Sequence, residues 1–262
     1  MLINVNGMKV NYELSGKKDL PVLLLSHSLG SSLVMWQPQM ECLEARYAVL
    51  RNDIRGHGRS EVPEGPYTLG LMAEDVRGLL DALKISRVHF VGLSMGGMIG
   101  LCLALNYPGR LQSLVLCDTS AIVSKEGALH IQERIDTARN KGMEALVDTR
   151  MERWFTPIFI RRNPPELELM RKEFLATPVE GYIQCSRALQ SLNYLHQLAE
   201  IKIPTLIMVG EEDPATPVAD SKMLNEGIQN SELVILPAAR HFSNVEQREV
   251  FNRTLTDFIE SV

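Results

Sequence analysis

The chain has 262 residues, of which 45% are hydrophobic and 23% charged, and its 27 basic and 32 acidic side chains leave a formal charge of −5. This composition predicts a soluble globular protein, either one large domain or a core with a smaller insert, and excludes low-complexity, collagen-like and disordered chains. The weakly acidic balance supplies no positive field for phosphate groups. We therefore expect no nucleic acid partner and no anionic membrane surface.

The chain opens with a predicted β-hairpin, in which the runs 2–5 and 8–14 flank the turn pair Asn6-Gly7. Short β-rich apolar segments then alternate with helical patterns. The predicted strands are 21–26, 48–52, 88–92, 111–117, 205–210 and 232–236, and the predicted helices are 35–45, 68–84, 95–106, 218–229 and 246–260. This alternation is typical of an α/β fold with a mostly parallel eight-stranded sheet and helices on both faces.

The alternation fails between residues 121 and 197. That segment carries charged residues at helical spacing, is broken by several prolines and offers no clear strand. We predict four or five short helices there, forming a cap over the carboxyl edge of the sheet, where ligands bind in such folds. The expected organisation is a core of residues 1–120 and 198–262 with a helical cap insertion at 121–197.

One segment raises the question of a membrane span, because residues 88–109 contain no charged side chain. Four glycines interrupt it, however, which indicates a strand, a tight turn and a buried helix. No secretory signal pattern is visible in residues 1–12, and the four cysteines have no CxxC spacing. We expect reduced thiols in a cytoplasmic protein, and the sequence leaves open whether it forms a homo-oligomer.

The sharpest chemical signal is the GxSxG motif around Ser94, which lies between an apolar strand and an apolar helix. A serine at so tight a turn has a strained backbone and glycine neighbours, and its side chain projects into the active site. The helix start also presents N–H groups to a developing negative charge. We predict that Ser94 is a nucleophile; the alternative is a structural turn with a capping serine.

A nucleophilic serine needs a histidine base held by a carboxylate, in the chain order serine, acid, histidine. Asp213 follows one predicted strand and His241 follows the next. We predict Asp213 as the orienting acid, because an Asp-Pro turn holds its carboxylate at the strand end, and His241 as the base. The rival acids are Glu211, Glu212 and, after an earlier strand, Asp118.

Two backbone N–H groups should bind the oxygen of the tetrahedral intermediate. We assign them to Met95, directly after the serine, and to Leu29, in the loop after an earlier strand. His27 and His57 also follow strands but precede the acid, so hydrogen bonding within loops and turns is their expected role. No histidine pair has metal-ligand spacing, and we expect no metal site.

These motifs together resemble the α/β-hydrolase superfamily over essentially the whole chain, and within it the 3-oxoadipate enol-lactonase group. The stretches that carry the resemblance are RGHG (55–58), GLSMGG (92–97), ERWFTP (152–157), ATPVEGYIQC (176–185), DPATP (213–217) and HFSNVEQ (241–247). The GLSMGG motif marks only the superfamily, whereas the others are more specific to the group. The resemblance implies an α/β-hydrolase fold and a lactone or ester hydrolase that needs no cofactor.

The predicted substrate-binding residues are Trp36, Trp154 and Arg187. In the group an arginine commonly follows the cap cysteine by five residues; here that position, counted from Cys185, is Gln190, and Arg187 is nearby. An anionic substrate needs a cationic partner. The other candidates in the cap are Arg134, Arg150, Arg153, Arg161 and Arg162.

We expect acyl transfer from a small lactone or ester to water, with 3-oxoadipate enol-lactone as the leading substrate. The alternative enzyme is a carboxylesterase for short acyl or aryl esters, whose cap pocket would be apolar and built from Trp154, Phe155, Ile158 and Phe159. A further alternative, of another class, is a non-catalytic small-molecule receptor on the same fold.

Overall fold

The computed structural model describes residues 1–17 and 19–262 and contains one sheet in the order β1-β2-β4-β3-β5-β6-β7-β8. The pairs β1–β2 and β2–β4 are antiparallel, and all the others are parallel. The predicted eight-stranded α/β sheet is therefore confirmed. The strands are β1 (Leu2–Val5), β2 (Met8–Ser15), β3 (Val22–Ser26), β4 (Ala48–Asn52), β5 (Val88–Leu93), β6 (Leu111–Cys117), β7 (Thr205–Gly210) and β8 (Ser231–Leu236).

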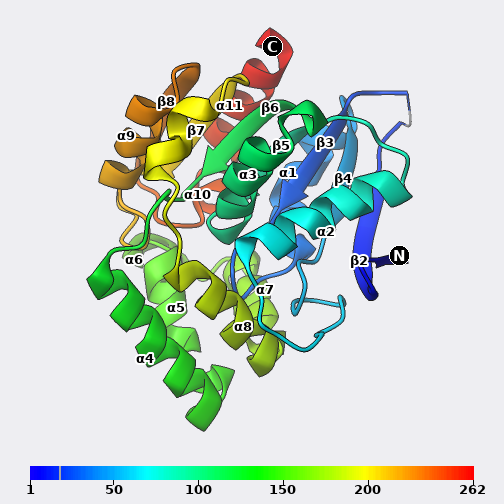
Figure 1. Ribbon diagram of the computed structural model, residues 1–262. Helices are drawn as coiled ribbons and strands as arrows, with labels where there is room; N and C mark the ends of the chain where they lie inside the picture. The colour runs from blue at the N-terminus through cyan, green and yellow to red at the C-terminus, as the bar shows by residue number, and fades with distance from the viewer. Residues whose placement is uncertain (18) are drawn as a thin grey trace.

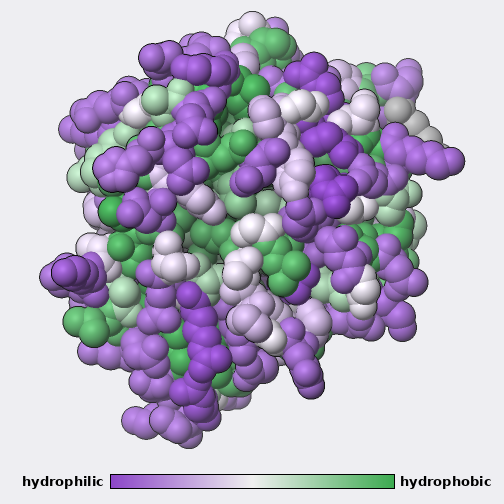
Figure 2. Space-filling model, in the orientation of Figure 1, coloured by the Kyte–Doolittle hydropathy of each residue, from purple (hydrophilic) through white to green (hydrophobic). Residues whose placement is uncertain are grey.

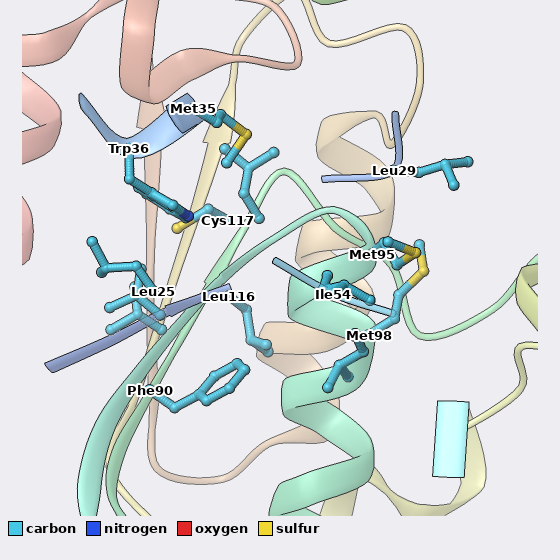
Figure 3. Close-up of a cluster of buried hydrophobic side chains, with 14 of the residues drawn as sticks. Leu25, Leu29, Met35, Trp36, Ile54, Phe90, Met95, Met98, Leu116 and Cys117 are labelled. Carbon is cyan, nitrogen blue, oxygen red and sulfur yellow. The ribbon is translucent and has the colours of Figure 1, made fainter. Parts of the chain in front are cut away.

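The parallel register brings the carboxyl ends of the central strands to one edge of the sheet. Ser26 at the end of β3 pairs with Gly92 of β5, and Cys117 at the end of β6 pairs with both Leu93 and Met208. The loops that follow these strands therefore meet. The sheet interior is apolar. Figure 3 shows buried side chains from three neighbouring strands, Leu25, Phe90 and Leu116, in one cluster with Met95 and Met98 of the helix that follows β5.

Helices cover both faces of the sheet (Figure 1). The helices α2 (Leu69–Ala82) and α3 (Met95–Asn106) pack together on one face, and α1 (Gln37–Glu44) packs with α11 (Arg248–Ser261) on the other. The helix α9 (Val218–Gly227) packs on β7 and β8.

Two predicted helices differ from the observed ones. The helix predicted at 35–45 begins as a 3₁₀ turn, Leu33–Trp36, and becomes α-helical only at Gln37. The helix predicted at 246–260 is preceded by a separate short helix, α10 (Ser243–Glu246), and α11 begins only at Arg248. The two are divided at Gln247, whose backbone is non-helical with φ −117° and ψ 44°.

The segment between β6 and β7 forms five α-helices, which we call the cap: α4 (Lys125–Lys141), α5 (Val147–Trp154), α6 (Pro157–Arg162), α7 (Pro165–Ala176) and α8 (Val179–Gln190). Figure 1 shows them together at one end of the sheet. The two ends of the segment meet in an antiparallel bridge between Ile122 and Asn193. The Val123 N–H donates to the Leu192 carbonyl (3.0 Å) beside it. The chain thus leaves the sheet after β6 and returns to it before β7 through two paired segments, and β6 and β7 are neighbours in the sheet.

On the face seen in Figure 2, hydrophobic residues show between hydrophilic ones, several of them near the junction of the core and the cap. Among the described residues, no helix combines the length and apolar character that crossing a membrane requires.

Candidate active site

Ser94 occupies the turn between β5 and α3, as predicted. Its backbone has φ 56° and ψ −115°, a conformation that a residue with a side chain rarely adopts. Its N–H donates to the Cys117 carbonyl (2.9 Å), and its own carbonyl accepts from the Thr119 hydroxyl (2.7 Å). The turn is therefore held from β6, and the Ser94 side chain makes no hydrogen bond that caps the helix.

The glycines around Ser94 are required by close backbone packing. A Cβ atom on Gly92 would lie 2.3 Å from the Gly96 carbonyl carbon, and one on Gly96 would lie 2.2 Å from the Ser26 carbonyl oxygen. Both distances are too short for any side chain. The GxSxG spacing is thus a steric condition for bringing the start of α3 against β3 and β5.

Asp213 and His241 form a buried pair. The His241 Nδ1–H donates to Asp213 Oδ2 at 2.8 Å, and both side chains are almost fully buried. The other oxygen, Oδ1, accepts from the Ala215 N–H (2.7 Å) and the Thr216 N–H (3.2 Å). This pairing leaves Nε2 of a neutral His241 without a proton, so this nitrogen can act as a base.

The pKa of Asp213 lies below its ordinary value although the residue is buried. Burial acts to raise this pKa, but the charge of His241, together with hydrogen bonds from His241, Ala215 and Thr216, more than offsets burial. The two rivals in the same loop, Glu211 and Glu212, are exposed. Asp213 therefore stays ionised beside the imidazole.

Ser94 and His241 are not hydrogen-bonded in this structure: among the described residues, His241 bonds through Nδ1 to Asp213 and makes no bond to Ser94 Oγ. The structure thus pairs the acid Asp213 with the base His241, whereas His241 and Ser94 are not in hydrogen-bond contact. Such contacts are often long in the absence of substrate and tighten in the substrate complex.

The predicted oxyanion donors, Leu29 and Met95, come from the loop after β3 and from the first turn of α3. Both residues are buried, and Figure 3 shows them in one cluster. Within the described part of the chain, neither backbone N–H donates a hydrogen bond. Both N–H groups are thus without an internal partner, as an oxyanion donor requires before substrate binds.

Comparisons with known proteins agree with this architecture. Residues 21–247 match the family model of the alpha/beta hydrolase fold. The chain belongs to this family. It is 38% identical to 3-oxoadipate enol-lactonase 2 of Acinetobacter baylyi, over 97% of this chain and 94% of that protein. It is 33% identical to a putative carbamate hydrolase RutD of Variovorax paradoxus, over 97% of each chain.

Among solved structures, the enol-lactonase of Burkholderia xenovorans superimposes on this alpha/beta hydrolase with a TM-score of 0.95. The two are 38% identical, and the match covers 99% of this chain and 100% of that one.

Two buried histidines hold the loop after β3 that carries Leu29 and Gly30, which we call the oxyanion loop after its predicted role, and hydrogen bonding within loops is the role predicted for both histidines. Nε2 of His57 accepts from the Gly30 N–H (3.0 Å), and Nε2 of His27 accepts from the Ile54 N–H (2.9 Å). Burial lowers the pKa of His27 to about 4 and that of His57 to about 3. Both rings are therefore neutral and act as acceptors at neutral pH.

These shifts predict a pH-dependent stability. The unfolded chain binds protons at both histidines below about pH 6.5, whereas the native protein does so only near pH 4 and 3. The free energy of unfolding should therefore fall as pH drops from about 6.5 toward 4, by up to about 1.4 kcal/mol per pH unit for each histidine. Urea unfolding of wild type and His57→Asn between pH 7 and pH 4.5 measures this, and the variant should show the shallower slope.

The matched control is His130→Asn, because His130 is exposed. This substitution should leave the slope unchanged. Equal slopes for wild type and His57→Asn would show that His57 is not held neutral by the fold.

Trp154 lies where the cap meets the histidine. It stacks on Phe242, the neighbour of His241, with ring centroids 4.2 Å apart, and Phe174 packs edge-on against it. Phe174 in turn contacts Tyr182, and a Cβ atom on Gly30 would lie 2.8 Å from Phe174. These aromatic rings therefore extend from the histidine to the oxyanion loop.

Trp36 and Arg187 lie in different surroundings, and the role in substrate binding predicted for both stays a prediction. Trp36 is fully buried and packs against Phe251 of α11, so it belongs to the core. Arg187 is exposed, because the buried face of α8 is formed by residues such as Cys185 and Ser186 and the next position turns outward.

Sequence reasoning missed the role of Glu246, which joins the cap to the histidine loop. Its Oε1 accepts from the N–H and the hydroxyl of Thr156 (2.9 and 2.7 Å), and its Oε2 accepts from the Arg240 N–H (2.7 Å). Thr156 lies in the ERWFTP stretch and Glu246 in the HFSNVEQ stretch, both of which carry the family resemblance. That resemblance was the only sequence feature that pointed to these two residues. Among the described residues, no group of His, Cys, Asp or Glu is arranged to hold a metal ion.

Proposed function

We propose that the protein is a serine hydrolase that opens a small enol-lactone carrying a carboxylate, with 3-oxoadipate enol-lactone as the leading substrate. The observation that carries the proposal is the buried Asp213–His241 pair, with Nδ1 and Oδ2 2.8 Å apart, at the same carboxyl edge of the sheet as the strained turn of Ser94. The enol-lactonase names of the relatives at 38% identity support the choice of substrate.

In the proposed reaction, Ser94 Oγ attacks the lactone carbonyl while Nε2 of His241 takes its proton. The N–H groups of Leu29 and Met95 bind the oxygen anion. The ring oxygen leaves as an enol, which receives the proton from His241, and the acyl group stays on Ser94. His241 then activates water, which releases the acid, and Asp213 holds the imidazole in the required tautomer throughout.

Two arginines of the cap support an anionic substrate. Arg134 on α4 and Arg150 on α5 form no ion pair among the described residues, and the Nε atom of each is buried without a partner. Burial and the neighbouring charge of Arg134 lower the pKa of Arg150 to about 10, so Arg150 is still cationic at neutral pH. Both arginines are half-buried, and two neighbouring guanidinium groups without an ionic partner favour a carboxylate ligand.

The hydroxyl of Tyr182 adds a third polar group near these arginines. It is buried without a hydrogen-bond partner among the described residues, and it lies close enough to Arg150 to act on the pKa of that arginine. Tyr182 also lies over Gly30 of the oxyanion loop. A substrate whose carboxylate binds Arg150 and the Tyr182 hydroxyl would therefore lie between the cap and the loop that carries Leu29.

The test compares three substrates: the enol-lactone, α-angelica lactone, which has a methyl group in place of the carboxymethyl arm, and p-nitrophenyl butyrate. Ser94→Ala supplies the background rate. The wild type should hydrolyse the enol-lactone with the highest kcat/KM. Turnover of none of the three above the background would refute the hydrolase proposal, and turnover of p-nitrophenyl butyrate alone would favour the carboxylesterase.

Arg150→Met should lower kcat/KM for the enol-lactone about 100-fold and leave that for α-angelica lactone within about threefold, because only the first carries the carboxylate. Arg187→Met is the matched control, since Arg187 is an exposed cap arginine, and it should affect neither lactone. An equal loss on both lactones after Arg150→Met would mean that the arginine supports the cap and not the carboxylate.

A further inference from the structure

Asp118, which the proposed mechanism does not use, lies at the centre of the three catalytic segments. It follows β6 directly, its side chain is fully buried, and its backbone has φ 44°. Its Oδ1 accepts from the Gly210 N–H (2.8 Å), and its Oδ2 accepts from the Ser243 hydroxyl (2.5 Å). Both oxygens are therefore occupied, and neither binds His241.

The two partners of Asp118 lie in the segments that carry the acid and the base. Gly210 is the last residue of β7 and stands three positions before Asp213, while Ser243 stands two positions after His241. The two segments also touch directly, since the Glu212 N–H donates to the Ala239 carbonyl (2.9 Å). A single carboxylate thus joins the acid segment to the histidine segment.

The neighbours of Asp118 hold the third segment. The Cys117 carbonyl accepts from the Ser94 N–H, and the Thr119 hydroxyl donates to the Ser94 carbonyl. Three consecutive residues at the end of β6 therefore contact the nucleophile turn, the acid segment and the histidine segment.

A buried carboxylate at this place is costly. Burial raises the pKa of Asp118 well above its ordinary value, and the charge of Asp213 raises it further. No arginine or lysine forms an ion pair with Asp118 in the described part of the chain. The group is therefore held by its hydrogen bonds to the two segments.

We propose that Asp118 is a positioning residue, which sets the distance of the Asp213–His241 pair from Ser94 through Gly210 and Ser243. This inference rests on the proposed function, because it assigns a role within the same site. It distinguishes Asp118 from a second catalytic acid, which would have to contact the imidazole.

The test uses Asp118→Asn, Asp118→Ala and Ser243→Ala in the full chain. Asparagine can accept from the Gly210 N–H and donate to Ser243 Oγ, so Asp118→Asn should keep kcat within about threefold. Asp118→Ala removes both bonds and should lower kcat about 10- to 100-fold at nearly unchanged KM. The kcat of Ser243→Ala should lie between those of Asp118→Asn and Asp118→Ala. The concentration of folded protein is measured by circular dichroism so that kcat refers to the folded fraction.

A spectroscopic readout separates this proposal from the proposed function. The proton on His241 Nδ1, shared with Asp213, gives a downfield ¹H NMR resonance, which should persist in Asp118→Asn and be shifted or lost in Asp118→Ala. If the wild type shows the resonance but hydrolyses none of the substrates, the proposed function is overturned. The positioning role of Asp118 is still supported in that case if the resonance persists in Asp118→Asn and is shifted or lost in Asp118→Ala. An unchanged resonance in folded Asp118→Ala would overturn the positioning role whatever the activity.

Discussion

Asp213→Asn is expected to lower kcat about 10,000-fold while the protein stays folded. Oδ1 of Asp213 accepts two backbone N–H groups, from Ala215 and Thr216, and only an oxygen can take that place. The asparagine amide nitrogen must therefore face His241 Nδ1, which becomes its acceptor. The imidazole proton then moves to Nε2, and the nitrogen that should take the serine proton is blocked.

The measurement is steady-state hydrolysis of p-nitrophenyl butyrate and the enol-lactone, with a thermal unfolding curve for each variant. Thr216→Val is the matched control: it removes a hydroxyl that donates to Oδ2 (2.8 Å) but leaves the carboxylate in place. We expect it to lower kcat only about three- to tenfold. If Asp213→Asn kept more than a tenth of the wild-type kcat, the acid would have to be another carboxylate.

Gly181→Ala is expected to destabilise the protein by about 3 kcal/mol or more and to lower Tm by about 6–12 °C. Gly181 lies in the first turn of α8, where a Cβ atom would lie 1.9 Å from the Gly56 carbonyl oxygen. The contact is backbone against backbone, so no side chain can move aside. The helix must shift away from the RGHG turn, and Tyr182 would then leave its place over Gly30.

Urea and thermal unfolding measure the loss of stability, and kcat/KM measures the displacement of the cap. Gly70→Ala is the control, because Gly70 also lies in the first turn of a helix but a Cβ atom there would meet only the Thr68 hydroxyl, at 3.7 Å. That change should be neutral or stabilising by up to about 1 kcal/mol. Equal stability of the two variants would show that α8 does not depend on this close contact.

Much of the site was predictable because its residues are tied to local structure. The GxSxG spacing predicts a strand-to-helix turn from steric demands that lie within a few consecutive residues. Asp213 and His241 follow apolar strands, and the carboxyl ends of parallel strands meet at one edge. Local patterns therefore sufficed for the Asp213–His241 pair and for the position of Ser94.

The surroundings of the other candidate side chains were not predictable in the same way. Trp36 and Arg187 have the expected chemistry, but the direction of each side chain depends on helix packing, which places one against Phe251 and the other in solvent. Arg134 and Arg150 were two of several candidates in a charged segment. What distinguishes them from the other candidates is that, among the described residues, the Nε atom of each is buried without a hydrogen-bond partner, and this depends on how α4 and α5 pack.

The sequence by itself determined the alternation of strands and helices, the helical insert and the chain order of serine, acid and histidine, because these follow from periodicity and from the stereochemistry of short turns. Only the tertiary structure decided that Asp118 bridges Gly210 and Ser243, that Glu246 joins Thr156 to Arg240, and that α8 lies on the RGHG turn. Each of these contacts joins residues from separate elements. Their existence depends on distances that no local pattern encodes.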